Sequence, residues 1–186
     1  SVLNQAKPGC HLLASVGPIR GTEGDIRTDI NDCTGGDRYR DDVARFHPDV
    51  SVLMFGEFPN EAVQLDGRWV MPCQEEYLEV WRAKLGDVVG DLGSGGAPVV
   101  LVTAPGTSLD WVLESVEPGM PERVRCMNQL LDDVARDTPG VEVIDLAEHV
   151  CPPDRSACLQ DIDGADLLRL LDNAPDHPPA QGDEAA

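Results

Sequence analysis

Small and polar residues follow one of the most apolar segments of the sequence, and their types suit the stabilisation of an oxyanion. Residues 50–55 read VSVLMF, and Gly56, Glu57 and Asn60 come soon after them. A glycine lets a backbone N–H approach a ligand closely, and an asparagine amide can donate a hydrogen bond at the same place. Such donors stabilise the negative oxygen that forms when a carbonyl group is attacked. The simpler interpretation is that Gly56 only makes a tight turn after a strand.

Other segments offer related chemistry. Gly9, in KPGC, follows the short apolar run at residues 1–4 and has the same two interpretations as Gly56. His149 follows the apolar run at 141–146 and has the side chain of a general base, although it could equally cap a helix. Glu57 and Glu61 have the side chains of an acid/base pair, but carboxylates in so acidic a chain are more often solvated.

A nucleophile is harder to find. The Gly-x-Ser-x-Gly elbow does not occur in the sequence, and neither does a phosphate-binding P-loop. Ser94, in GSGG, is interpreted as part of a helix terminus. Ser108 follows TAPGT, and spacing ties no general base to it.

The elements that must position these residues alternate along the chain. Apolar runs predict strands at 1–4, 50–55, 98–104 and 141–146, and apolar residues at helical spacing predict helices at 37–46, 72–96 and 121–140. This alternation predicts an α/β protein with a parallel sheet and right-handed crossovers. In such sheets ligands bind beyond the carboxyl ends of the strands, where the candidate residues would meet.

Length and composition indicate one domain. The 186 residues suffice for a single hydrophobic core. We assign the domain to residues 1–171 and interpret 11–36 as a long loop. Residues 172–186 are acidic and rich in proline, so their composition predicts a disordered tail.

The chain is strongly acidic, with 14 Lys and Arg against 34 Asp and Glu and a formal net charge of -20. That charge repels phosphate backbones and anionic lipid surfaces, so we expect no nucleic-acid partner. Its simplest role is solubility. The sequence has no apolar run near the roughly 20 residues of a membrane span and no recognisable signal peptide.

Six cysteines occur without a CxxC pair, and the four histidines are scattered, so we expect neither a metal site nor a cofactor. An even count fits disulfides and an oxidising compartment. Cys151 and Cys158 flank a short loop, and Cys10 and Cys33 could tie down the loop between them. The alternatives are buried free thiols, or a redox or metal protein that uses the six cysteines.

Six motifs stand in order along residues 1–165: NxxxPGC, FHPDVSVLMFG preceded by a cysteine, DGRW, GAPVVLVTAP, RVRCMNQLL and VEVIDLAEHVCP. Together they resemble the SGNH (GDSL-type) hydrolase domain, in the form attached to bacterial membrane acyltransferases of the acyltransferase-3 type. The resemblance implies a three-layer α/β/α sandwich with a flavodoxin-like sheet. It also implies a serine esterase or O-acyltransferase for O-acylated (acetylated) cell-surface carbohydrate, located outside the cytoplasmic membrane or secreted. A membrane acyltransferase domain would be a possible N-terminal partner.

The resemblance also implies residue roles in an oxyanion site. Gly9 matches the glycine of the family's second block, and Gly56 matches the glycine that opens its third block. Asn60 stands one or two positions later than the family's asparagine. Glu57 follows Gly56 directly, where we include it among the substrate-binding candidates.

The remaining catalytic groups match less closely. His177 is the best candidate for the base, and Asp172 and Asp176 lie near it out of the family's register. The nucleophilic Gly-Asp-Ser would fall before Ser1. We therefore expect an enzyme whose nucleophile lies outside these residues, and negligible esterase activity from them alone. The alternative is a non-catalytic relative that binds a glycan or a protein partner.

Overall fold

The computed structural model describes residues 2–5, 10–21, 24–34, 36–55, 61–104 and 120–146, and every structural statement below concerns these residues. They form three helices and nine short strands, in the mixed α/β arrangement that the sequence predicts. No helix among them combines the length and the apolar character needed to cross a membrane.

The central sheet consists of three parallel strands in the order β5-β8-β9. Their bounds are Ser51–Met54, Val99–Val102 and Val141–Ile144. In the register, Ser51 lies opposite Val99 and Val99 lies opposite Val141. The strands predicted at 50–55, 98–104 and 141–146 and their parallel pairing are thus confirmed.

The strand predicted at residues 1–4 is not formed. Residues 2–5 are described, but they belong to no strand. A strand needs a hydrogen-bonded neighbour, and none of the described strands pairs with this segment.

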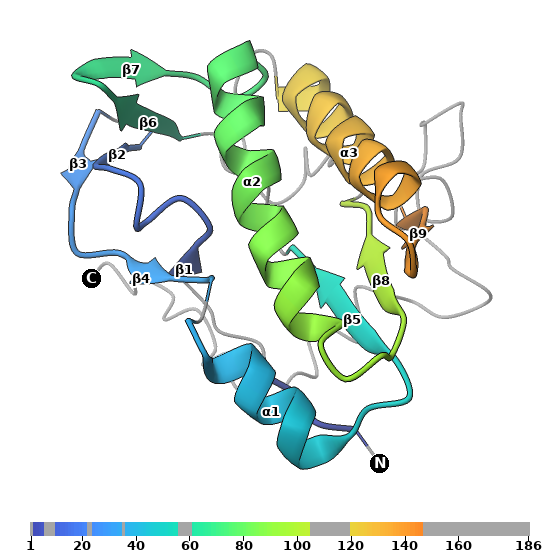
Figure 1. The fold of residues 1–186 in the computed structure, drawn as a ribbon. Coiled ribbons are helices and arrows are strands. Elements are labelled where there is room, and N and C mark those ends of the chain that lie inside the picture. Colours follow the sequence, from blue (N-terminus) through green and yellow to red (C-terminus); the bar gives the residue numbers. More distant parts are fainter. Residues whose placement is uncertain are drawn as a thin grey trace, which may run out of the picture.

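Helices cover one face of the sheet, as Figure 1 shows, with α2 and α3 in front of β5, β8 and β9. The three helices are α1 (Arg38–Phe46), α2 (Glu75–Leu92) and α3 (Met120–Asp137), within the ranges that the helical patterns predict or close to them. Apolar residues at helical spacing face the core, which includes Tyr77, Trp81, Leu85, Val88, Val89, Val124, Met127, Leu130, Leu131 and Val134. No described helix lies behind the sheet, so the three-layer sandwich stays a prediction.

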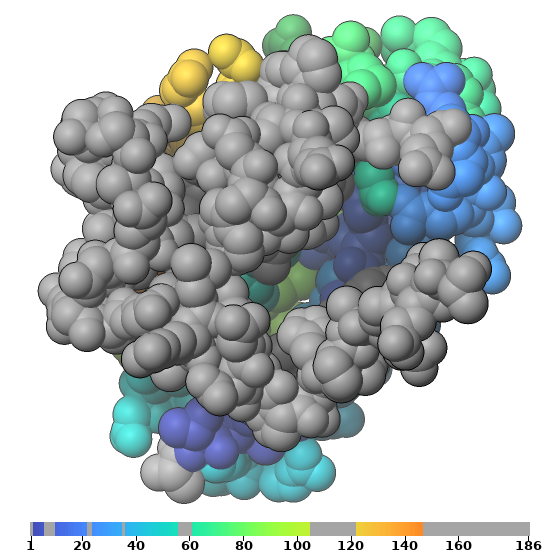
Figure 2. Space-filling view, turned by 180° about the vertical axis from the view of Figure 1, so that it is seen from behind, coloured from blue at the N-terminus to red at the C-terminus, as the bar shows by residue number. Residues whose placement is uncertain are grey.

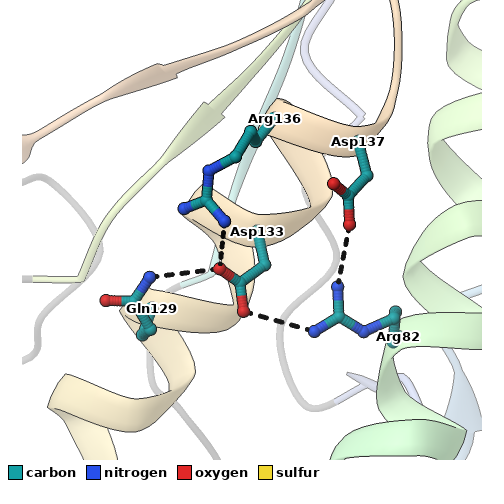
Figure 3. Close-up of polar contacts among 5 residues, drawn as sticks. All are labelled: Arg82, Gln129, Asp133, Arg136 and Asp137. Atoms are coloured by element: carbon teal, nitrogen blue, oxygen red, sulfur yellow. Dashed lines mark hydrogen bonds and ion pairs between the residues drawn. The ribbon is translucent and has the colours of Figure 1, made fainter.

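A cluster of charges joins α2 to α3 on the outside of this layer (Figure 3). Arg82 of α2 reaches Asp133 of α3 at 3.3 Å and Asp137 at 3.9 Å. Gln129 and Arg136 also donate hydrogen bonds to Asp133. These hydrogen bonds, that from Gln129 foremost, lower the pKa of the Asp133 carboxyl, which keeps it ionised as the shared partner of the cluster.

The prediction of a long loop at residues 11–36 was wrong in part. It contains pieces of four short strands: β1 (Cys10–His11), β2 (Ile19–Arg20), β3 (Ile26–Arg27) and β4 (Asn31–Asp32). β1 pairs with β4 in parallel, and β2 and β3 join the hairpin of β6 (Ala62–Leu65) and β7 (Arg68–Val70) in the order β3-β2-β6-β7. Strands of two residues are too short to show a period of two, so the sequence pattern could not reveal them. The hairpin turn is made by Asp66 and Gly67, both with positive φ.

Two disulfides are present among the described cysteines. Cys10–Cys33 is one of the predicted pairs and is confirmed. Cys73–Cys126 was not predicted, and it joins the segment before α2 to α3. Cys151 and Cys158 lie outside the described residues. Two disulfides in a chain of this size are consistent with an oxidising compartment.

Candidate functional site

The loop with Gly56, Glu57 and Asn60 lies outside the described residues, but both of its neighbours are described, and both are anchored. Phe55, at the end of β5, stacks against Trp81 of α2 with ring centroids 5.0 Å apart. Trp81 is almost completely buried, so it offers a rigid surface to Phe55. The chain therefore leaves the central sheet from a fixed position.

Glu61 follows the same loop and is fixed by charge. Its carboxylate accepts a hydrogen bond from the Arg27 guanidinium, and its other oxygen lies 3.6 Å from His11 Nε2. Arg27 also lies 3.2 Å from Asp25. Three segments distant in sequence thus meet at Glu61, namely β1, β3 and the start of β6.

His11 is neutral in this cluster. Burial, and then the positive charge of Arg27, lower the pKa of its imidazole to about 4. Its Nδ1 accepts a hydrogen bond from the Leu13 N–H at 3.0 Å, so the ring proton belongs on Nε2, which faces Glu61. With Nδ1 engaged and Nε2 protonated, His11 has no lone pair for a general base, and its position indicates a structural role.

Glu61 is also unsuited to the acid/base role that the sequence allowed. Both oxygens of its carboxylate are already engaged, one by the Arg27 guanidinium and the other by the contact with His11. We therefore interpret Glu61 as the anchor of its loop. Its possible partner Glu57 lies outside the described residues.

The His11–Glu61 contact has a consequence for the two glycine turns. Cys10, the residue after Gly9, is held by the disulfide to Cys33 and by the pairing of β1 with β4. The described residues that follow the two candidate turns therefore meet each other. Gly9, Gly56 and Asn60 themselves lie outside the described residues, so their roles stay predictions.

The ends of β8 and β9 form a second polar group at the carboxyl edge of the sheet. The buried hydroxyl of Thr103 donates a hydrogen bond to Asp145 at 2.9 Å. The Asn128 side chain of α3 accepts from the Ala104 N–H at 3.0 Å and donates to the Ala104 carbonyl at 2.8 Å. The Asn128 side chain thus bonds both backbone groups of Ala104, as a neighbouring strand would, and it holds the chain in place where it leaves β8.

A second carboxyl faces Asp145. Burial, and then the negative charge of Asp145, raise the pKa of Asp132 on α3. Two carboxylates at a sheet edge can hold a cation when further ligands join them. Among the described residues, however, no group of three or more His, Cys, Asp or Glu side chains is placed to hold a metal ion.

The proposed catalytic base and its partners are not placed by the structure. His177, Asp172 and Asp176 lie outside the described residues, and so does His149. His47 ends α1 in a left-handed conformation.

Sequence reasoning missed three residues of these two polar groups: His11 and Arg27 beside Glu61, and Asn128 at the end of β8. Asn128 had a usable signal, because it is a polar residue four positions after Val124 and three before Leu131, within the apolar stripe of its helix. A polar side chain at such a position needs a buried partner. His11 and Arg27 gave no comparable signal, because their strands are too short to predict.

Comparison with protein-family models gives no match, and comparison with curated protein sequences gives none either. The interpretation of the candidate site therefore depends on the described residues and their geometry.

Proposed function

We propose that this chain belongs to a serine esterase or O-acyltransferase of the SGNH (GDSL-type) kind that acts on O-acylated, for example acetylated, cell-surface carbohydrate. The observation that carries the proposal is the contact between His11 and Glu61, at 3.6 Å. This contact joins the chain that follows Gly9 to the chain that follows Asn60. The described residues beside two segments that are far apart in sequence, and whose residue types suit oxyanion donors, thereby contact each other.

In the proposed reaction the nucleophilic serine belongs to a segment that precedes Ser1. Its Oγ forms a bond to the acyl carbon, while the backbone N–H groups of Gly9 and Gly56 donate to the developing oxyanion. His177 takes the serine proton and passes it to the sugar oxygen as the C–O bond of the ester breaks. Water, or a hydroxyl group of an acceptor sugar, then attacks the acyl-serine and releases the serine.

The two disulfides support a location outside the cytoplasm, in the cell envelope or secreted. We propose that the protein acts there beside, or joined to, a membrane acyltransferase domain. Asn60 and Glu57 would contact the substrate, and Asp172 or Asp176 would orient His177.

The experiment compares two proteins with a fluorophosphonate probe, which labels activated serines. One is the 186-residue chain, and the other is the same chain extended by the preceding codons of its gene, by about 40 residues or one strand-helix unit. We expect one labelled serine in the extended chain and none in the shorter one.

Hydrolysis of p-nitrophenyl acetate should follow the same pattern. An extended chain without a labelled serine would exclude the enzyme and leave a domain that binds a glycan or a protein partner. A labelled serine in the shorter chain would also contradict the proposal, because the nucleophile would then lie within these residues.

A further inference from the structure

Arg27 joins two carboxylates across a strand. It belongs to β3, at the edge of the order β3-β2-β6-β7, and Glu61 stands just before β6. The Arg27 guanidinium donates to Glu61 and lies 3.2 Å from Asp25, so its side chain spans β2. Figure 2 shows that the lighter blue surface of the segment with β3 adjoins the green surface of β6 and β7. Arg27 therefore ties the start of β6 to a strand that is not its neighbour in the sheet.

The sequence leaves room for this contact at Gly21, directly after β2. The Gly21 N–H donates to the Asp25 carbonyl at 2.9 Å. A side chain at Gly21 would push the Asp25 carboxylate aside, because a Cβ atom there would collide with it. With glycine in place, Asp25 and Glu61 share the same guanidinium. Loss of the Arg27 charge would leave two like charges close together, so each carboxylate would turn away from the other.

The contacts continue from Glu61 to the buried end of β1. The other Glu61 oxygen lies 3.6 Å from His11 Nε2, and His11 Nδ1 accepts from the Leu13 N–H at 3.0 Å. His11 is 9% exposed and Leu13 is fully buried. Because the imidazole ring is held at both nitrogens, a displacement of Glu61 is transmitted to the backbone that follows β1. The contacts thus run from Arg27 to Leu13 through side chains of three separate segments.

The ion pair of Arg68 and Glu76 shows what distinguishes Arg27. Arg68 is on β7 of the same sheet and lies 3.3 Å from Glu76, but these side chains are 68% and 50% exposed. Such exposed pairs contribute little, because water and salt screen them. Glu61 is 23% exposed and has a second partner in the buried His11. Replacing Arg27 should therefore move its partner, whereas replacing Arg68 should leave the surrounding structure unchanged.

We propose that Arg27 positions the two segments of the candidate site relative to each other, by holding Glu61 against His11. One segment is the chain that follows Gly9, and the other is the chain that follows Asn60. Because Arg27 acts through Glu61, it is a positioning residue and not a catalytic one. Its consequence for catalysis rests on the proposed function, in which donors from both segments must meet one oxyanion. The coupling between the segments does not rest on that function.

The coupling is tested in the 186-residue chain by amide hydrogen exchange, measured residue by residue by NMR. In Arg27→Gln we expect the Leu13 amide to exchange at least about 10-fold faster, because Glu61 then no longer holds the His11 ring that accepts from it. The Leu101 amide of the central sheet is the internal control and should not change. Arg68→Gln is the matched variant, since it removes an arginine charge from the same sheet, and it should leave Leu13 exchange as it is.

The consequence for catalysis is tested in the extended chain by the hydrolysis of p-nitrophenyl acetate. Arg27→Gln should lower kcat by about 10-fold or more, because a small misplacement of groups at a reacting centre has effects of this size. KM should change by less than about 3-fold, since the loss falls on the transition state. Arg27→Lys should recover most of kcat, because an ammonium group can still pair with Glu61. Arg68→Gln should keep the parent kcat, and urea unfolding of each variant verifies that folded protein is assayed.

Unchanged Leu13 exchange in Arg27→Gln would overturn the inference. An unchanged kcat in an extended chain that a fluorophosphonate labels would do the same, and so would an equal loss of kcat in Arg27→Gln and Arg68→Gln, which would indicate a general effect of charge. Faster Leu13 exchange, together with an extended chain that no fluorophosphonate labels, would support the coupling of the two segments and refute the esterase. The two proposals can therefore fail separately.

Discussion

Replacing Asn128 with alanine should destabilise the protein, because its side chain holds the residues that follow β8. The Asn128 side chain satisfies both the N–H and the C=O of Ala104, at 3.0 and 2.8 Å. Ala104 is 5% exposed, so solvent cannot replace these bonds without a rearrangement. A buried polar group left without a partner costs about 1–3 kcal/mol, so we expect the two groups together to cost about 2–4 kcal/mol.

Urea unfolding measured by circular dichroism under non-reducing conditions provides the assay. With a typical slope of roughly 2 kcal/mol per molar urea, the midpoint should fall by about 1–2 M without a change in slope. Gln129→Ala is the matched control, because the neighbouring side chain bonds only the exposed cluster around Asp133 and should change the midpoint little.

Asn128→Asp tests the reasoning further. Above the pKa of the new carboxyl, its oxygens can accept from the Ala104 N–H but repel the Ala104 carbonyl. Below that pKa the protonated carboxyl can donate again, so Asn128→Asp should approach the unsubstituted protein in acid. A loss under about 0.5 kcal/mol for Asn128→Ala, which is the range of ordinary surface substitutions, would show that this edge is not held by the Asn128 side chain.

Three further predictions concern other parts of the described structure. Because the folded-state pKa of His11 is lowered from 6.5 to about 4, the unfolded chain binds the extra proton first, and the stability contributed by neutral His11 should be lost as the pH falls through that interval. His11→Gln should flatten this part of the pH dependence in urea titrations, and a profile unchanged by the substitution would contradict the assignment. Replacing both Cys73 and Cys126 with alanine should lower the unfolding free energy by up to about 4 kcal/mol, measured by denaturation against the unreduced parent, since their bridge closes a long loop. Asp132→Asn should raise the melting temperature at pH 7, because burial and Asp145 oppose the charge of this carboxyl, and it should lose that advantage in acid; a lower melting temperature at pH 7 would refute this account.

The elements that could be predicted from the sequence are those whose residues follow a long regular pattern. The apolar run at 50–55 and the spacing of Tyr77, Trp81 and Leu85 each repeat a signal over several residues, and both were confirmed as β5 and α2. The Cys73–Cys126 bridge could not be found in this way, because its partners are brought together only when α2 packs against α3. The strands between residues 10 and 32 are defined by pairing with distant segments and not by their own composition.

The same limit applies to the candidate site. Gly9 and Gly56 stand out as residue types at the ends of apolar runs, but the groups that hold the neighbouring chain come from elsewhere. Arg27 reaches Glu61 from β3, and Cys33 reaches Cys10 from beyond β4. Such contacts between distant segments leave no periodic trace in the sequence.

The charges of the cluster around Glu61 limit which groups could stabilise an oxyanion beside it. Arg27 is the cation of the described cluster around Glu61, and Glu61 and Asp25 both pair with it. Its positive charge is therefore compensated, in a protein whose formal net charge is -20. Stabilisation of a negative oxygen would then depend on backbone N–H dipoles, which act only when the turns that carry them are held in place. The disulfide at Cys10, the stacking of Phe55 on Trp81 and the pairing of Glu61 each fix a residue beside such a turn.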